Sequence, residues 1–205
     1  MVSNKRLVEQ CVVFKRQVSA AYLTVLFMFA FSLPAHALEI VVSGHKASEN
    51  DPQGYSLFIA DNFSRKSPFY WSLGVSRYDD VYVEWNNSNL KFPIDSAEAA
   101  LSYRHHFNSR SPIVRNFSME YQLGVAASLT DNKFTWVELN EEKYFSETGD
   151  VNGFLALSAH YKISSNFSAI MGVKHFPKVS EFGSISSVFL GVKFNLNFSP
   201  TYYGN

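Results

Sequence analysis

The sequence predicts an all-β chain that closes into an eight-stranded antiparallel up-and-down transmembrane β-barrel. Three observations predict this fold. Apolar and polar residues alternate along most of the chain after residue 37, which is the period of a half-buried strand. Most predicted strands have nine residues or more, about the length that a tilted strand needs to cross a bilayer. Short and long connections alternate between the strands, as is typical of barrels that cross membranes.

The N-terminus predicts a segment that is removed from the mature protein. Basic residues precede an apolar run over 18–33, and the run ends in Pro34-Ala35-His36-Ala37. A basic region, an apolar stretch and a small-residue cleavage site together indicate a secretory signal peptide over 1–37. An uncleaved membrane anchor is the alternative. The barrel domain is then expected over 38–205.

The composition of residues 38–205 excludes several classes. The only cysteine of the chain, Cys11, lies in the signal segment, so no disulfide framework is expected. Removal of the four basic and one acidic residues of 1–37 from the totals of 18 each leaves 14 basic and 17 acidic residues, a net charge of −3. That balance argues against nucleic acid as a partner. No run of 18 apolar residues remains, so no helix is expected to span a membrane.

The alternation is clearest over 117–129. Apolar residues occupy the odd positions from Phe117 to Leu129, and mostly small or polar residues occupy the even ones. The same reading predicts eight strands, over roughly 38–46, 53–63, 68–85, 93–107, 116–131, 150–163, 166–176 and 185–198. The connections after the second, fourth and sixth strands are short. Those after the first, third and fifth are expected to be longer loops, the last of them the acidic stretch 131–150.

An Asn-Phe-Ser tripeptide recurs on the short-turn side, at 62–64, 116–118, 166–168 and 197–199. It belongs to a predicted ring of outward aromatics at the headgroup boundary. The ring comprises Phe63, Phe69, Phe107, Phe117, Tyr161, Phe167 and Phe198. A looser set, Tyr78, Trp85, Phe134 and Trp136, is expected to mark the other boundary.

The polar face of each strand is expected to point into a narrow, filled lumen. The inward candidates are Glu39, Glu98, Arg104, His106, Glu120, His160, Lys162, Lys174 and Lys193. Because buried charges need partners, Glu98 and Glu120 are expected to pair with Arg104, Lys174 or Lys193. The alternative is that these charges line a narrow channel for small solutes.

The last predicted strand alternates apolar and polar residues and ends on an aromatic: Gly191, Phe194, Leu196 and Phe198 carry this pattern. It resembles the assembly signal of the small eight-stranded outer-membrane proteins of Gram-negative bacteria, of the OmpA/OmpX/OmpW type. The resemblance implies an outer-membrane location, contact with outer-membrane lipid and lipopolysaccharide, a monomeric state and recognition by the barrel-assembly machinery. The chain departs from the pattern by seven residues, 199–205, after Phe198.

Chemical sites are weakly indicated. Lipid A-modifying enzymes of this class need a serine, a histidine and an acid near the outer rim, but Ser158 and His160 lie near the short-turn side in reversed order. His45 and His175, with Ser43 or Glu181, have uninformative spacing. His105 and His106 are adjacent and so point to opposite faces of a strand. The acidic stretch 138–150 lacks the pattern of a calcium loop. No catalytic, cofactor or metal site is therefore expected.

A soluble lipocalin-like carrier is the rival fold, and it would place the apolar residues inside. For the barrel, the expected function is non-enzymatic: a structural or surface-interaction role through long extracellular loops, with an unidentified outside partner. Exposed aromatics commonly anchor interfaces, so the expected contact residues are Trp85, Trp136, Tyr144 and Phe145. A narrow channel and a lipid A-modifying enzyme are the alternatives.

Overall fold

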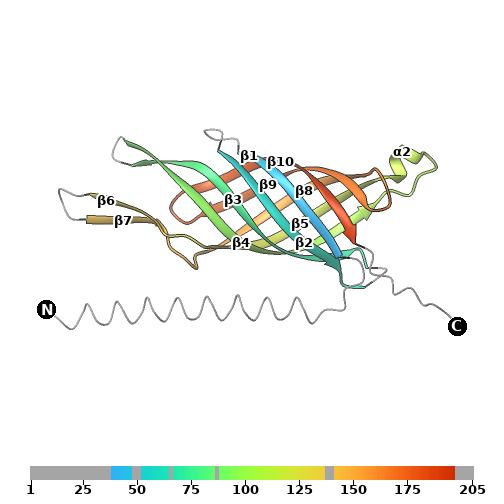
Figure 1. Ribbon diagram of the computed structural model, residues 1–205, viewed down its shortest axis with the longest axis horizontal. Helices are drawn as coiled ribbons and strands as arrows, with labels where there is room; N and C mark the ends of the chain where they lie inside the picture. Colours follow the sequence, from blue (N-terminus) through green and yellow to red (C-terminus); the bar gives the residue numbers. More distant parts are fainter. Residues whose placement is uncertain (1–37, 48–51, 65–66, 86–87, 137–140, 197–205) are drawn as a thin grey trace. The chain divides into compact units, whose positions relative to one another are not determined.

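Eight strands form one closed antiparallel barrel, as the sequence predicted (Figure 1). The computed structural model describes residues 38–47, 52–64, 67–85, 88–136 and 141–196. The barrel strands are β1 (Leu38–Ala47), β2 (Gln53–Asn62), β3 (Phe69–Trp85), β4 (Ser88–His106), β5 (Phe117–Ser128), β8 (Val151–Lys162), β9 (Phe167–Val179) and β10 (Gly183–Leu196). Their order around the barrel is β1-β10-β9-β8-β5-β4-β3-β2, and the pairing of β1 with both β10 and β2 completes the circle. Closure leaves no free strand edge in the wall.

The barrel has two different ends. The turn end holds the connections over 63–68, 107–116 and 163–166, together with the paired residues Leu38 and Leu196. The loop end holds the other connections. In Figure 1 the short helix α2 (Pro112–Arg115) lies at the turn end, and strands β6 (Asn132–Trp136) and β7 (Glu141–Ser146) extend from the loop end.

The wall is apolar outside and polar inside. On β5, Leu123 is 64% exposed on the outer face, whereas Glu120 on the inner face is buried. The same holds for β10, where Leu190 and Phe194 are exposed and Lys193 is buried. A lipocalin-like carrier would have the opposite arrangement. The rival fold is therefore excluded, and the wall suits a lipid environment.

The connection over 131–150 was expected to be a loop, but it contains a second sheet. Strands β6 and β7 pair antiparallel, from Asn132 opposite Ser146 to Trp136 opposite Glu141. The base of this hairpin is held to the barrel because the N–H of Ser128 donates to the carbonyl of Asp150 over 2.8 Å. The β6–β7 hairpin is thus a folded extension of the loop end.

The expected long loop after the third strand is also wrong. Strand β4 begins at Ser88 rather than 93, and β3 and β4 pair as far as Trp85 opposite Ser88. The register shifts once, between Tyr78 and Val81, where Asp80 adopts a φ of 55°. A bulge of this kind increases the local twist of the two strands. Beyond it, β3 and β4 remain paired from Val81 opposite Phe92 onward.

Aromatic rings pair on the outer face of the turn end. The ring centroids are 5.5 Å apart for Phe69 and Tyr103, 5.3 Å for Phe117 and Tyr161, and 5.2 Å for Phe167 and Phe194. This belt is where rings are expected at a headgroup boundary. The looser set at the other boundary is wrong for Tyr78, which is buried inside the barrel. Phe198 lies outside the described residues.

Residues 1–37 also lie outside the described residues, so the signal peptide remains a prediction. Among the residues that the structure does describe, no helix is long and apolar enough to cross a membrane.

Candidate functional site

A charged cluster fills the lumen near the turn end. The guanidinium of Arg104 donates to both carboxylate oxygens of Glu39, over 2.9 and 2.8 Å, and through Nε to Glu120 over 2.7 Å. Lys193 Nζ donates to Glu39 Oε1 over 3.2 Å. The Arg104 guanidinium carbon also lies 3.8 Å from the centre of the Tyr70 ring. Two acids and two bases, all buried, thus compensate one another inside the lumen.

His160 adjoins this cluster without forming a catalytic triad. Its Nε2 lies 2.9 Å from Ser158 Oγ and 3.4 Å from Glu120 Oε2. Its Nδ1 is buried and has no hydrogen-bond partner among the residues that the structure describes. A triad histidine binds the serine through one nitrogen and the acid through the other. Here one nitrogen faces both groups inside a buried lumen, so the arrangement does not provide a serine nucleophile for outer-leaflet lipid.

A second ion pair lies closer to the middle of the barrel. Glu98 on β4 accepts hydrogen bonds from Lys174 on β9 and from Ser76 on β3. The Lys174 ammonium also lies over aromatic rings, 4.2 Å from the centre of Phe154 and 5.0 Å from that of Phe176. The carboxylate and the rings together surround a buried cation.

The loop half of the lumen carries a neutral hydrogen-bonded network around His45. Its Nε2 lies 3.1 Å from Ser43 Oγ and 2.9 Å from Ser56 Oγ, and its Nδ1 lies 3.2 Å from the Tyr78 hydroxyl. The Tyr78 hydroxyl continues the network to Ser187 over 3.2 Å. The suggested Ser43–His45 pair is therefore real, but it is part of a buried structural network without an acid in it.

Apolar side chains close the lumen above this network. The buried residues of this group include Val81, Ile94, Phe154, Phe176, Val179 and Ile185. Phe154 depends on a glycine, because a Cβ at Gly124 would lie 2.4 Å from its ring. Between the two charged groups remains a cavity of about 60 Å³, lined among others by Arg104, His160 and Lys174. It is large enough for a few water molecules.

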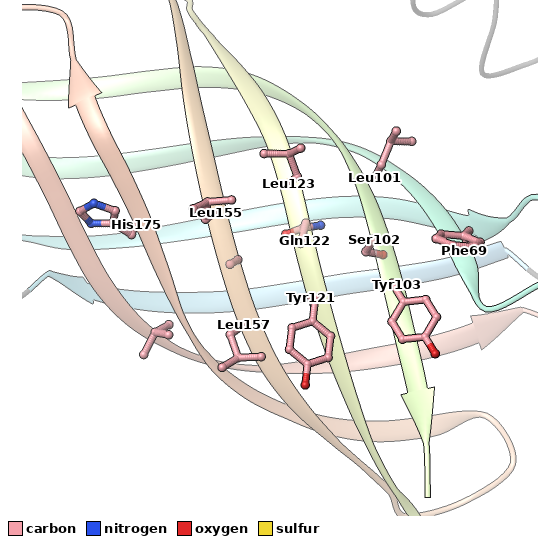
Figure 2. A pocket seen from close by; sticks show the side chains of 12 residues that line it. Phe69, Leu101, Ser102, Tyr103, Tyr121, Gln122, Leu123, Leu155, Leu157 and His175 are labelled. Carbon is pink, nitrogen blue, oxygen red and sulfur yellow. The ribbon is translucent and has the colours of Figure 1, made fainter.

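A larger hollow of about 580 Å³ lies on the outside of the wall. Figure 2 shows it over β4, β5, β8 and β9, with Leu101, Leu123, Leu155 and Leu157 projecting around it and the rings of Tyr103 and Tyr121 beside them. In a bilayer such an apolar recess is filled by lipid hydrocarbon, so it is a feature of the membrane-facing surface.

The predicted lumen residues fall into two groups: those well inside the strands are buried in the lumen, and those at the strand ends are exposed. Glu98, Arg104, Glu120, Lys174 and Lys193 are all buried in the barrel, and each carboxylate has a cationic partner. His106 and Lys162 are wrong as lumen residues, because both are exposed at the turn end. Their positions share the inward face, but their strands end there. Glu39 is inward as predicted, and it also pairs with both Arg104 and Lys193, which the sequence does not indicate.

Of the predicted contact residues, one is exposed, one is buried and two have side chains that the structure does not describe. Tyr144 is 40% exposed, and its hydroxyl donates to Glu142 over 3.1 Å. Phe145 is wrong as a contact residue, because it is 3% exposed and packs on Phe92 and Phe182, with ring centroids 5.2 and 6.2 Å away. The side chains of Trp85 and Trp136 lie outside the described part of the chain.

In the predicted assembly motif, Phe194 and Leu196 are exposed on the outer face of β10. Gly191 has a packing reason of its own, because a Cβ there would lie 2.3 Å from the carbonyl oxygen of Val42. Recognition of this motif by assembly machinery remains a prediction.

No protein-family model matches the chain, and no curated protein is significantly similar to it in sequence. Solved structures that are similar in fold include the following two. The N-terminal β-barrel domain of Pseudomonas aeruginosa OprF is 14% identical, with a TM-score of 0.51, and the match covers 79% of this chain and 98% of that one. Yersinia pestis Ail, the attachment invasion locus protein, solved with the heparin analogue sucrose octasulfate, is 10% identical, with a TM-score of 0.50, over 78% and 99%.

The likeness to these two structures concerns the fold alone. Combined with the apolar outer wall, the belt of rings at the turn end and the charged interior, it confirms the prediction from the sequence. The chain has the closed eight-stranded barrel fold of these two structures, and its apolar outer wall suits a position across a membrane.

Proposed function

We propose that this barrel is a non-enzymatic surface protein whose loop end contacts a partner outside the cell. The observation that carries the proposal is the anchored β6–β7 hairpin. Phe145 packs against Phe92 and Phe182, and its carbonyl accepts the N–H of Glu181 over 3.0 Å. A folded projection with a pre-organised surface loses less conformational entropy on binding than a flexible loop does.

The charge of this projection restricts the partner. The stretch 131–150 contains six acidic and two basic residues. Although Ail was solved with a sulfated heparin analogue, the acidic stretch would repel a polyanion. We therefore propose a cationic partner surface, with Tyr144 as an aromatic contact.

The test compares cells that display the wild-type chain with cells that display a variant in which 132–146 is replaced by a short Gly-Ser turn. Asp131 and 147–150, which close the base of the hairpin, are retained. Adhesion to immobilised poly-lysine and to immobilised heparin is measured. Loss of salt-sensitive adhesion to poly-lysine in the variant, with equal amounts of folded barrel, supports the proposal. Equal adhesion of both strains contradicts it.

The two alternatives have their own tests. The lumen cavity of about 60 Å³ between ion pairs favours a closed barrel, so planar-bilayer recordings are expected to lack discrete conductance steps. The geometry of Ser158 and His160 favours no hydrolase activity, so lipid A mass spectra are expected to be the same with and without the protein. Discrete conductance steps would contradict the proposal in favour of a channel. A lipid A mass change that is abolished by His160→Ala would contradict it in favour of an enzyme.

A further inference from the structure

The helix α2 at the turn end is exposed on every side. None of its four residues is buried, and Ile113 and Val114 are 64% and 41% exposed. The helix contacts the barrel at β5. Two adjacent apolar side chains therefore stand at the turn end without a packing role in the described barrel.

Unpaired cations surround these apolar side chains. Arg110 precedes the helix and Arg115 is its last residue, and both are exposed. Lys162 is also exposed and lies beside the same connection, because its N–H donates to the carbonyl of Asn116 over 2.9 Å. Within the described ranges none of these three cations forms an ion pair. Their charges are therefore available to an anionic partner.

The charge of the connections at this end has one sign. The stretches 63–68, 107–116 and 163–166 contain four basic residues and no acidic residue. At the loop end, by contrast, 131–150 contains six acidic residues and two basic ones. The connections at the turn end thus carry a net positive charge, and the stretch 131–150 at the loop end carries a net negative one.

The depth of α2 relative to the bilayer follows from its neighbours. The connection runs between Phe107 and Phe117, which are both exposed aromatics, and the Phe117 ring pairs with Tyr161 in the turn-end belt. Because aromatic belts lie at headgroup level, a helix two residues from Phe117 lies close to the phosphates. Apolar side chains with neighbouring cations are the combination that holds a segment in that layer.

We propose that α2 with Arg110, Arg115 and Lys162 forms a binding surface, here called the turn-end anchor, for anionic phospholipid in the leaflet at the turn end. Ile113 and Val114 insert among the acyl chains, and the three cations contact phosphodiester headgroups. A four-residue helix offers too little area for a stable protein interface, which needs about 800 Å² from each partner. Lipid headgroups, by contrast, are present at this depth in high concentration.

The first experiment measures the depth of residue 113. Ile113→Cys is made in a Cys11→Ser background, which removes the only other cysteine, and is labelled with an environment-sensitive fluorophore in nanodiscs. Spin-labelled lipids are expected to quench this fluorophore, whereas one at Thr135→Cys, on exposed β6, is expected to remain in water. A water-exposed fluorophore at residue 113 in nanodiscs of anionic lipid would overturn the proposal in favour of a soluble partner.

The second experiment tests the charges. Native mass spectra count phosphatidylglycerol and phosphatidylcholine molecules retained by the barrel in detergent. Each cation near an anionic surface contributes about fivefold in binding, so Arg110→Gln with Arg115→Gln is expected to lower the preference for phosphatidylglycerol about 25-fold at low salt. Lys178→Gln, an exposed cation toward the loop end of β9, is the matched control and should leave the preference unchanged. An equal effect of both changes, or of neither, would overturn the proposal. The faster migration of unboiled protein verifies that every variant is folded.

Discussion

Arg104 on β4 and Glu39 on β1 are joined by two parallel hydrogen bonds, although 65 positions separate them in the sequence. Arg104→Met leaves Glu39 with only Lys193 and deprives Glu120 of its main partner. Breaking a buried pair costs about 3–5 kcal/mol, so the urea midpoint of unfolding in detergent should fall markedly. Arg104→Lys keeps the charge but loses the fork geometry, and its loss should be smaller. A midpoint unchanged in Arg104→Met would refute the assigned role.

The central pair predicts non-additive effects. Lys174→Met leaves Glu98 buried with only Ser76, and Glu98→Gln leaves Lys174 among aromatic rings. Each single change should destabilise the barrel by about 3–5 kcal/mol, whereas the double change should destabilise it by less than the two combined. The measurement is a double-mutant cycle of unfolding free energies. Additive losses would mean that the two groups do not interact.

The outer wall predicts a depth-dependent penalty for charge. Leu123 lies near the middle of β5 and is 64% exposed on the outer face. Leu123→Arg should destabilise the barrel by about 2–4 kcal/mol, the value for arginine near the bilayer midplane. Thr135→Arg, on the exposed hairpin, is the control and should have no effect. Unfolding in lipid vesicles measures both, and a tolerated Leu123→Arg would argue for a wall in contact with water.

Two adjacent aromatics on β7 should behave differently. Phe145 is buried against Phe92 and Phe182, whereas Tyr144 is exposed. Phe145→Ala removes a packed ring, at a typical cost of about 3–5 kcal/mol, and should open the hairpin to trypsin at Lys133 or Lys143. Tyr144→Ala should leave the cleavage rate near that of the wild type. Equal cleavage of the two variants would contradict the buried position of Phe145.

The hairpin also predicts a pH effect. A hydrogen bond of 3.0 Å from Lys133, supported by Tyr144, holds the pKa of Glu142 below its ordinary value of 4.5. Because the folded-state pKa is lowered, the stabilisation is present at neutral pH and is lost as the pH falls through that pKa. The carboxyl-carbon chemical shift of Glu142 should therefore titrate below 4.5. Lys133→Gln should move the midpoint upward, and Lys143→Gln, whose cation faces Glu181, should not.

The inward and outward faces of the barrel wall could be predicted from the sequence, because alternation along a strand does not depend on residues far away in the chain. The outward Leu123 and inward Glu120 follow from position along one strand. The same rule fails at strand ends, where His106 has the inward parity of Arg104 but lies beyond the enclosed lumen. The odd or even position of a residue along a strand predicts which face of the sheet it occupies. It does not predict how far along the barrel axis the residue lies.

The hairpin was missed for a related reason. Strands β6 and β7 have only five and six residues, and β7 begins with three charged ones, so they give too short a pattern of alternation. The sequence predicts an exposed aromatic at Phe145 because this residue lies in an acidic stretch and its partners, Phe92 and Phe182, lie far away in sequence. Pairings of that kind depend on the closed barrel that brings the segments together.

The pair of Arg104 with Glu39 has a consequence for the order of assembly. Glu39 and Lys193 lie on the first and last strands, which meet only when the sheet closes. Until then Arg104 has Glu120 alone, and Glu39 has no cation from β4. A sheet that has not yet closed therefore carries unpaired charges on the face that becomes the lumen. These charges are paired only when β1 meets β10. The pairing of β1 with β10 should consequently give the largest drop in free energy during insertion. This disfavours partly paired intermediates and barrels with a free strand edge.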